Sequence, residues 1–354
     1  MSRHHNGARL REFTENGRRV LVLENELLRV EVLPDKGSDI VSFLHKPSDV
    51  DPMWRSALGL RPPAPGGRLR GTDEAAFLDE YEGGWQECLP NGGAAVTYRG
   101  APVPFHGELW SAAWDVTVLE DMPDRVSVLL AVETARTPFR VEKRLTLEAG
   151  RSAILVDETV TNLSPAPIEF MWGHHPAFGA PFLDETCRID VPATTGSTVR
   201  AAPLPTSRLA FGAQFAWPMA PLALGGTTDL RRVPPPDEGR DEWVCLSGLD
   251  EGWYGITSGR QKVGFGLRWD AAVFPYLWYW QVWGGDRDYP WWGRHYNCAL
   301  EPWTSWPDSG LTEAIANGSA RTLEGHESLS TRLIAVAYAG RDGINGIREN
   351  GEVF

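Results

Sequence analysis

The sequence has no excess of basic residues and no long apolar run. Its 354 residues include 34 Lys and Arg against 47 Asp and Glu, which gives a formal net charge of −13 at pH 7. Nucleic acid phosphates require clustered Lys and Arg, so we expect no nucleic acid partner, and a strongly anionic substrate is disfavoured. No apolar run reaches the length of a membrane span, and residues 1–6 lack the apolar core of a signal peptide. We therefore expect a cytoplasmic protein with no membrane partner.

Cysteine is also scarce. The four cysteines are far apart and form no Cys-x-x-Cys pair, which indicates neither a zinc knuckle nor a disulfide framework. We expect structural thiols at Cys88, Cys187, Cys245 and Cys298.

Amphipathic helical periodicity is nearly absent, and short stretches of Val, Leu, Ile and aromatic residues recur between polar turns. This pattern predicts strands at residues 19–23, 28–33, 40–44, 125–130 and 139–147, with turns at 25–26, 35–37, 148–151 and 162–165. Residues 61–72 and 225–241 are poor strand material, and we expect long surface loops there. The segment after Tyr338 could fray or add an edge strand.

The strand pattern resumes unchanged after each of these loops. We therefore predict one domain over residues 1–354, in which 1–12 and 340–354 are candidate flexible tails. With many strands and few helices, the economical fold is all-β, a large antiparallel β-sandwich with one sheet concave enough to hold a ligand.

Tryptophan is abundant and unevenly distributed. Half of the sixteen tryptophans fall between Trp269 and Trp306, and Glu301 lies in the same window. A pyranose presents C–H bonds on one face and hydroxyls at its edges, so flat indoles beside a few fixed polar groups suit a sugar. A tryptophan-rich core is the alternative interpretation.

Two histidine motifs favour a site. His174 and His175 are adjacent, and neighbours in an extended chain point to opposite faces, so only one of them can enter a shared site. Pro176 restricts His175 to extended geometry. His106 is followed by Gly107, which permits close approach of backbone or ligand, and aromatic residues flank it. Each histidine could instead be a hydrogen-bonded structural residue.

Several further polar and aromatic residues are candidates for contacting a ligand. Gln281 is the only amide in the aromatic strand 276–283, and a buried amide needs a partner that a sugar hydroxyl could supply. Glu301, beside Pro302 and Trp303, has apolar surroundings that raise a carboxyl pKa towards the range of a base, unless a cation such as Arg294 pairs with it. The turn-rich stretch 84–93 offers an indole and three polar side chains, or is an ordinary polar loop: Trp85, Gln86, Glu87 and Asn91.

At these residues the chain resembles the aldose 1-epimerase (galactose mutarotase-like) family. The resemblance runs from residues 23–32 and 37–43, through His106-Gly107 and the 175–178 motif, to Leu300-Glu301-Pro302. It implies the family's galactose mutarotase-like supersandwich with a concave sugar-binding face.

The resemblance also implies catalytic roles. His175 matches the acid that protonates the ring oxygen, His106 the assisting group and Glu301 the base that takes the anomeric proton. It implies an isomerase that interconverts the α and β anomers of a small-molecule sugar without a metal or another cofactor, as a monomer or homodimer. For substrate binding we expect the following residues: Trp85, Gln86, Glu87, Asn91, Trp172, Gln281 and Trp303.

The chain departs from the family pattern in three places. The sugar-contacting arginine upstream of the first histidine has no match, Gly179 replaces an asparagine, and the mid-chain aspartate could be Asp229, Asp241 or Asp250. These departures leave the sugar and its modification open.

Four alternatives stay open. A non-catalytic carbohydrate-binding protein would not need both an acid and a base, and an epimerase of a phosphorylated sugar would need converging Arg or Lys. A glycoside hydrolase would need a second carboxylate, for which Glu87 is available. A metal site of His174, His295 and Glu301 has no recognisable ligand spacing.

Overall fold

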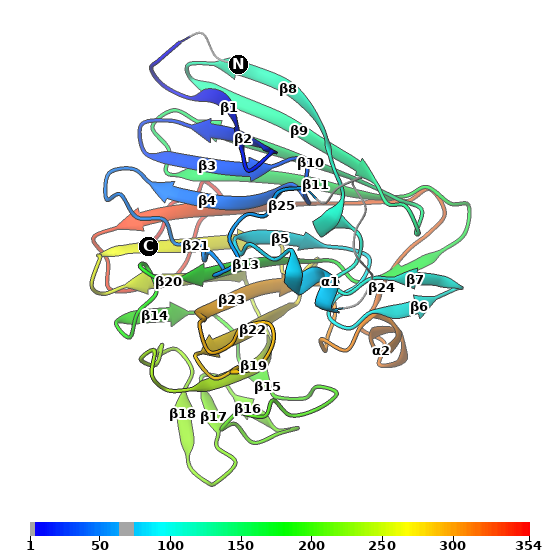
Figure 1. Ribbon diagram of the computed structural model, residues 1–354. Coiled ribbons are helices and arrows are strands. Elements are labelled where there is room, and N and C mark those ends of the chain that lie inside the picture. Colours follow the sequence, from blue (N-terminus) through cyan, green and yellow to red (C-terminus); the bar gives the residue numbers. More distant parts are fainter. Residues whose placement is uncertain (1–3, 64–73) are drawn as a thin grey trace.

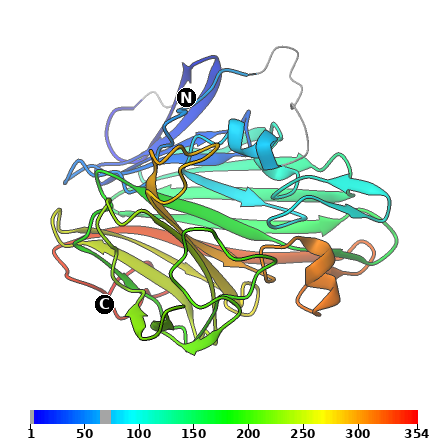
Figure 2. The same ribbon diagram turned by 60° about the horizontal axis from the view of Figure 1, so that its bottom comes forward.

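The computed structural model describes residues 4–63 and 74–354, and strands dominate it (Figure 1). Two large antiparallel sheets stack face to face, and Figure 2 shows the layers from a second direction. Several strands alternate buried with partly exposed residues, as β11 does along all ten of its positions. That alternation is typical of a sheet with one face in a core. The predicted all-β sandwich is confirmed.

The larger sheet has eleven strands. In spatial order they are β1 (Arg9–Glu15), β2 (Arg18–Glu24), β3 (Leu28–Leu33), β4 (Asp39–His45), β5 (Trp85–Cys88), β13 (Gly173–Gly179), β23 (Tyr296–Trp303), β22 (Tyr276–Trp283), β19 (Arg240–Ser247), β15 (Thr195–Ser197) and β16 (Gln214–Ala216). Its centre, β5-β13-β23-β22, unites segments from three distant parts of the chain.

The second sheet has eight strands. They are β14 (Cys187–Asp190), β20 (Gly252–Ser258), β21 (Val263–Trp269), β25 (Ser328–Ala339), β11 (Ala153–Asn162), β10 (Phe139–Glu148), β9 (Arg125–Glu133) and β8 (Asp115–Met122). Three two-stranded sheets complete the described strands: the hairpin β6 (Val96–Tyr98) with β7 (Ala101–Val103), the hairpin β17 (Met219–Pro221) with β18 (Thr227–Asp229), and β12 (Ile168–Phe170) with β24 (Arg321–Leu323), which are far apart in the sequence.

Aromatic residues from both sheets meet in the core between them. Phe43 of β4 packs edge-on against Phe265 of β21 at a ring-centroid distance of 5.0 Å, and Phe178 of β13 lies 5.1 Å from the same ring. All three are fully buried. Burying an aromatic side chain stabilises the fold by about 2–3 kcal/mol, so these contacts hold β4 and β13 firmly on the second sheet.

The five strands predicted from the sequence match β2, β3, β4, β9 and β10 to within three residues at each end. The expected loop at 225–241 is partly wrong, because Thr227–Asp229 forms β18 and Arg240 begins β19. Polar threonines make a short hairpin strand there that apolar alternation does not reveal. Most of the other expected loop, 61–72, lies outside the described residues. Beyond β25 the chain adds only a bridge between Ile347 and Val353, packed on Trp253.

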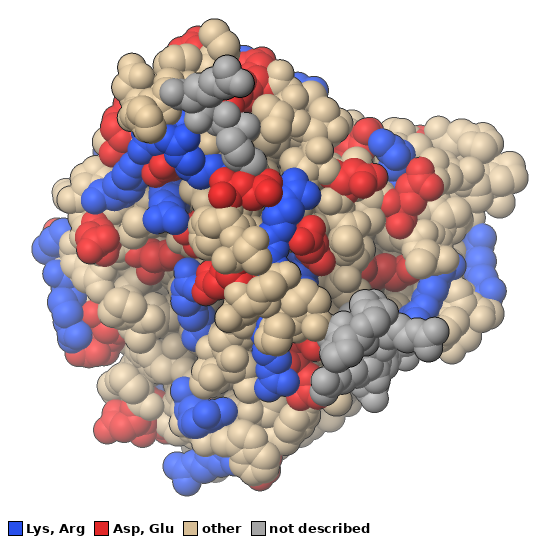
Figure 3. Space-filling view, turned by 45° about the horizontal axis from the view of Figure 1, so that its top comes forward, with Lys and Arg blue, Asp and Glu red and all other residues tan. Residues whose placement is uncertain are grey.

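The described helices are short. α1 (Glu74–Asp79) lies over the outer face of the larger sheet in Figure 1, and α2 (Leu311–Ala316), orange in Figure 2, lies at one end of the layers. Within the described residues no helix is long and apolar enough to cross a membrane. On the face of the molecule in Figure 3, acidic and basic residues are interspersed.

Candidate active site

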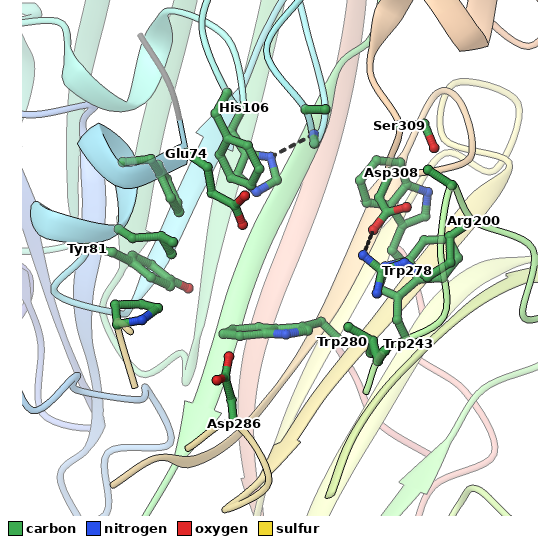
Figure 4. A pocket seen from close by; sticks show the side chains of 18 of the residues that line it. Glu74, Tyr81, His106, Arg200, Trp243, Trp278, Trp280, Asp286, Asp308 and Ser309 are labelled. Carbon is green, nitrogen blue, oxygen red and sulfur yellow. Dashed lines mark hydrogen bonds and ion pairs between the residues drawn. The ribbon is translucent and has the colours of Figure 1, made fainter. Parts of the chain in front are cut away.

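A cavity of about 690 Å³ opens on the outer face of the larger sheet, the face turned away from the second sheet. Its floor comes from β13, β22 and β23, and its walls from α1 and from loops around residues 93–106, 200–204, 286–291 and 308–309. Figure 4 shows Tyr81, Glu74 and His106 on one side and Arg200 and Asp308 on the other. The volume is typical of a small-molecule site.

The three residues matched to catalytic roles, Glu301, His175 and His106, all line this cavity. The strands place two of them by register, since β13 and β23 are neighbours in the sheet and both side chains point to its outer face. His106 arrives from the loop after β7. The expectation that only one of two adjacent histidines enters the site is confirmed, because His174 lies on the core side of β13.

His175 is held on both sides of its ring. Its Nε2 lies 3.4 Å from Oε1 of Glu301, and its Nδ1 lies 3.1 Å from the hydroxyl of Tyr81. All three side chains are buried. A tyrosine hydroxyl both donates and accepts, so Tyr81 can hold the ring whether Nδ1 carries a proton or not. The arrangement directs Nε2 towards the carboxyl group and the cavity.

His106 adopts a left-handed backbone conformation, with φ of 57°. Such a conformation is rare for a residue with a side chain and is typical of functional sites. Its Nδ1 accepts a hydrogen bond of 3.1 Å from the backbone N–H of Gly93, which leaves the proton of a neutral ring on Nε2. The rings of His106 and His175 lie 5.4 Å apart between centroids. His106 is therefore arranged as a neutral hydrogen-bond donor.

Trp303 positions the other end of the Glu301 carboxyl group. Its indole N–H donates to Oε2 of Glu301 at 3.0 Å, and its ring stacks on Trp278 with centroids 4.1 Å apart. Gly173 faces this ring across the β13–β23 pair, and a Cβ there would come within 2.2 Å of the indole. Only glycine fits, so the indole can lie flat against the sheet.

Burial sets the protonation states of the three residues. It raises the pKa of Glu301 well above its usual range, opposed in part by the hydrogen bond from Trp303. It lowers the pKa of His175 to about 4 and that of His106 well below 6.5, the latter also because His175 lies close. The pH range in which the His175–Glu301 pair holds one proton therefore begins near pH 4 and is extended upward by the raised pKa of Glu301.

Three of the residues expected to bind substrate point into the core instead. Trp85, Glu87 and Trp172 share the side of the sheet occupied by His174, because β5 pairs with β13 in the register Glu87 to His174. The indole of Trp172 donates to Glu87 at 2.8 Å, and that of Trp85 donates to His174 at 3.1 Å. None of the three lines the cavity.

A buried charged cluster occupies the core behind His175. Lys143 lies 2.8 Å from Glu87 and 3.9 Å from Glu158, and Nε2 of His174 lies 3.0 Å from Glu158. Burial raises the pKa of Glu158 to about 7 and lowers that of His174 to about 4. The cluster supports β13 from the side opposite the cavity.

Gln281 also faces the core. It shares a face of β22 with Leu277 and Tyr279, both core residues, and accepts a hydrogen bond from the indole of Trp283. The opposite face of β22 carries Trp278 and Trp280, which line the cavity, and Trp278 pairs directly with Glu301. The strand alternates as predicted, but the face of β22 predicted to contact the sugar is the face in the core.

The remaining three expected residues lie near the cavity without lining it. Gln86 donates to the backbone oxygen of Gly83, and Trp303 supports Glu301 from beneath. Asn91 joins two loops to the start of α2, donating to the oxygens of residues 94 and 104 and accepting from the N–H of Leu311. All three are fully buried and hold their surroundings in place.

Sequence reasoning missed several lining residues, among them Tyr81, Trp243, Trp280, Arg200 and Asp308. Trp280 could have been found by testing the second face of its strand. Tyr81 and Arg200 lie in segments without strand alternation, so no local pattern marked them. The aspartates proposed as mid-chain candidates do not line the cavity: Asp229, Asp241 and Asp250. His174 lies on the opposite face of the sheet from Glu301, so the metal ligands considered above are not brought together.

The family with the description "Domain of unknown function (DUF4432)" matches residues 15–335, most of the chain. The protein belongs to the DUF4432 family. No curated protein matches the sequence.

Solved structures resemble this DUF4432 protein over nearly its whole length. A candidate aldose 1-epimerase from Klebsiella pneumoniae has a TM-score of 0.69 at 15% identity, covering 94% of this chain and 87% of its own. A galactose mutarotase-like protein from Clostridium acetobutylicum has a TM-score of 0.64 at 15% identity, with 94% and 99% covered. A candidate aldose 1-epimerase from Escherichia coli K12 has a TM-score of 0.57 at 16% identity, with 94% and 100% covered.

At these identities the likeness establishes the fold. The resemblance inferred from the sequence is therefore confirmed as a galactose mutarotase-like β-sandwich for this DUF4432 protein. A shared fold does not specify chemistry, so the chemistry of the cavity depends on the residues that line it.

Proposed function

We propose that this protein is an aldose 1-epimerase, which interconverts the α and β anomers of a sugar. The observation that carries the proposal is the contact of 3.4 Å between Nε2 of His175 and Oε1 of Glu301 inside an aromatic cavity, with His106 beside them. A base and an acid this close can act together on O1 and O5 of a sugar, because both oxygens are bonded to the same hemiacetal carbon, C1.

The reaction follows from these positions. Glu301, as the carboxylate, takes the proton of the anomeric hydroxyl while the C1–O5 bond breaks and His175, as the imidazolium, protonates O5. The ring opens to an aldehyde without a full charge developing on the sugar. Rotation about C1–C2 and reclosure, with both protons returned, give the other anomer.

The proton inventory of the site suits this sequence of steps. Before ring opening the pair holds its one proton on His175, and after ring opening it holds one proton on Glu301. The opposed pKa shifts of the two groups favour the second state, a protonated carboxyl beside a neutral imidazole. The two states differ only by the position of protons within the site, so no proton has to be exchanged with solvent during ring opening.

Two neighbours complete the proposed mechanism. Tyr81 holds the His175 ring through Nδ1 in both charge states. His106, a neutral donor, supplies an N–H to the sugar oxygen on which negative charge begins to develop, which stabilises the transition state electrostatically.

The walls support a carbohydrate as the ligand. Trp280, Trp278 and Trp243 line the cavity, and indole faces suit the C–H face of a pyranose. A protein that only bound sugar would gain nothing from a buried carboxyl and imidazole in contact, because burying such a pair costs free energy. That cost is understandable in a catalyst.

Anomer exchange measured by NMR saturation transfer tests the proposal. The panel consists of neutral aldoses, deoxy sugars and acidic sugars, with wild type compared against Glu301→Gln. We expect wild type to accelerate exchange of at least one sugar and Glu301→Gln to lose about a hundredfold or more of that rate while still binding the sugar. Asp157→Asn on the exposed face of β11 is the matched control and should retain the wild-type rate. Acceleration by no sugar would contradict an epimerase.

A further inference from the structure

Arg200 and Asp308 form an ion pair on the side of the cavity opposite Tyr81 (Figure 4). Nη2 of Arg200 lies 2.6 Å from Oδ2 of Asp308, and both side chains are half-buried. Arg200 comes from the loop after β15, and Asp308 from the loop between β23 and α2. The pair joins two parts of the chain that the sheet does not connect directly.

Both members of the pair are fixed by their surroundings. The guanidinium of Arg200 lies over the ring of Trp243, 5.7 Å from its centroid, which restrains the arginine plane. The backbone oxygen of Asp308 accepts a hydrogen bond from the backbone N–H of Ala94, and Gly93 forms an isolated antiparallel β-bridge with Ser309. Gly93, at φ of 71°, has no room for a Cβ, which would meet the Asp308 oxygen at 1.7 Å. The backbone N–H of Gly93 also donates to Nδ1 of His106, so one loop positions both His106 and Asp308.

We infer that Arg200 and Asp308 together determine substrate specificity by binding two adjacent hydroxyl groups of the sugar, remote from the anomeric carbon. The inference rests on the proposed function and extends it to the recognition of substrate. A guanidinium only donates hydrogen bonds and a carboxylate only accepts them, whereas each hydroxyl does both. Side by side, the pair matches a vicinal diol, one hydroxyl donating to Asp308 and its neighbour accepting from Arg200.

The charge around the cavity decides against an anionic substrate. Arg200 is the only Lys or Arg among the described lining residues, and Asp308 neutralises it. Glu74 and Asp286 add further acidic groups to the lining. A phosphate or carboxylate group needs converging, unneutralised cations, which these residues do not offer. The distal end of the substrate is therefore uncharged and carries hydroxyl groups.

The test uses galactose, glucose, deoxy analogues that each lack one distal hydroxyl, the primary phosphate esters and the uronic acids. Anomer exchange gives kcat and KM, and titration calorimetry gives affinity independently of turnover. The variants are Arg200→Gln and Asp308→Asn. The control is Arg208→Gln, which removes an arginine paired with Glu242 at 2.9 Å outside the cavity.

We expect Arg200→Gln and Asp308→Asn to raise KM and Kd about tenfold or more for the best neutral sugar, with kcat changed about threefold at most. The same substitutions should have little effect on a deoxy analogue that lacks one hydroxyl of the diol, because the contact is already lost. Arg208→Gln should match wild type.

The inference is overturned if both variants keep Kd within about twofold for every sugar, or if a phosphate ester or uronic acid binds best. Failure of the proposed function gives a different result. No sugar would then exchange its anomers faster than in buffer, but calorimetry could still measure sugar binding and its loss in the two variants. If no sugar binds at all, the diol-binding role is refuted as well.

Discussion

Nε2 of His175 lies 3.4 Å from Oε1 of Glu301, and the two side chains are at most 6% exposed. An acid and a base in direct contact titrate as one unit, and their pKa shifts run in opposite directions, raised for the carboxyl and lowered for the imidazole. The pair therefore carries one proton over a wide pH range.

We predict a bell-shaped pH dependence of kcat/KM. The acidic limb should fall near pH 4, where a second proton enters the His175–Glu301 pair and removes the base. The basic limb marks the loss of the shared proton, governed by the raised pKa of Glu301. Exchange rates at constant ionic strength between pH 4 and 10 measure both limbs, with circular dichroism to verify folding. An acidic limb at the ordinary histidine value near pH 6.5 would contradict the shared-proton arrangement.

Removing the Tyr81 hydroxyl should slow the reaction without weakening binding. Tyr81→Phe keeps the ring but removes the partner of His175 Nδ1, so we expect kcat to fall about tenfold and KM to change about twofold at most. The acidic limb of the pH profile should also move. Tyr254→Phe is the matched control, since Tyr254 is fully buried in the core away from the cavity lining. If Tyr81→Phe and Tyr254→Phe changed kcat equally, Tyr81 would contribute only to packing and not to the position of His175.

The indole N–H of Trp303 should tune the base. This hydrogen bond lowers the pKa of Glu301, so Trp303→Phe raises it further and leaves less carboxylate available. We expect a lower kcat at neutral pH and a basic limb displaced to higher pH. Trp283→Phe, which removes an indole N–H bonded to Gln281 in the core, serves as the control. An unchanged basic limb would show that the bond does not act on Glu301.

The cluster behind His175 should make stability depend on pH. Glu158 has a pKa of about 7 in the folded protein against 4.5 for a solvent-exposed glutamate, so the folded state holds a proton that the unfolded state loses between these values. The contribution of Glu158 to the free energy of unfolding is fully present below about pH 4.5 and is lost as the pH rises towards 7. Glutamine does not titrate, so the free energy of unfolding of Glu158→Gln should rise relative to that of wild type when the pH is changed from 5 to 8. We expect a relative increase on the order of 2 kcal/mol.

Urea unfolding of both proteins at the two pH values measures this difference. Glu133→Gln, at an exposed position of β9, is the control and should follow wild type at both pH values. A difference between Glu158→Gln and wild type that stays constant with pH would mean that Glu158 does not hold its proton in the core.

Much of this protein is determined by local sequence. Alternating apolar residues and turn residues predict β2, β3, β4, β9 and β10, because a strand with one face in the core must alternate. Strand parity also separates His174 from His175, and the motifs around His106, His175 and Glu301 predict three residues that line one cavity.

Only the tertiary structure decided which face of each central strand meets a ligand. β5 and β13 are buried along both faces, and β22 carries aromatic side chains on both faces, so alternation cannot distinguish the core side from the cavity side. Cross-strand register made that choice, sending Gln281 and Glu87 inward and Trp280 outward. Tyr81, Arg200 and Asp308 come from connections without periodicity, and only the packing of distant segments over the sheet brings them to the cavity.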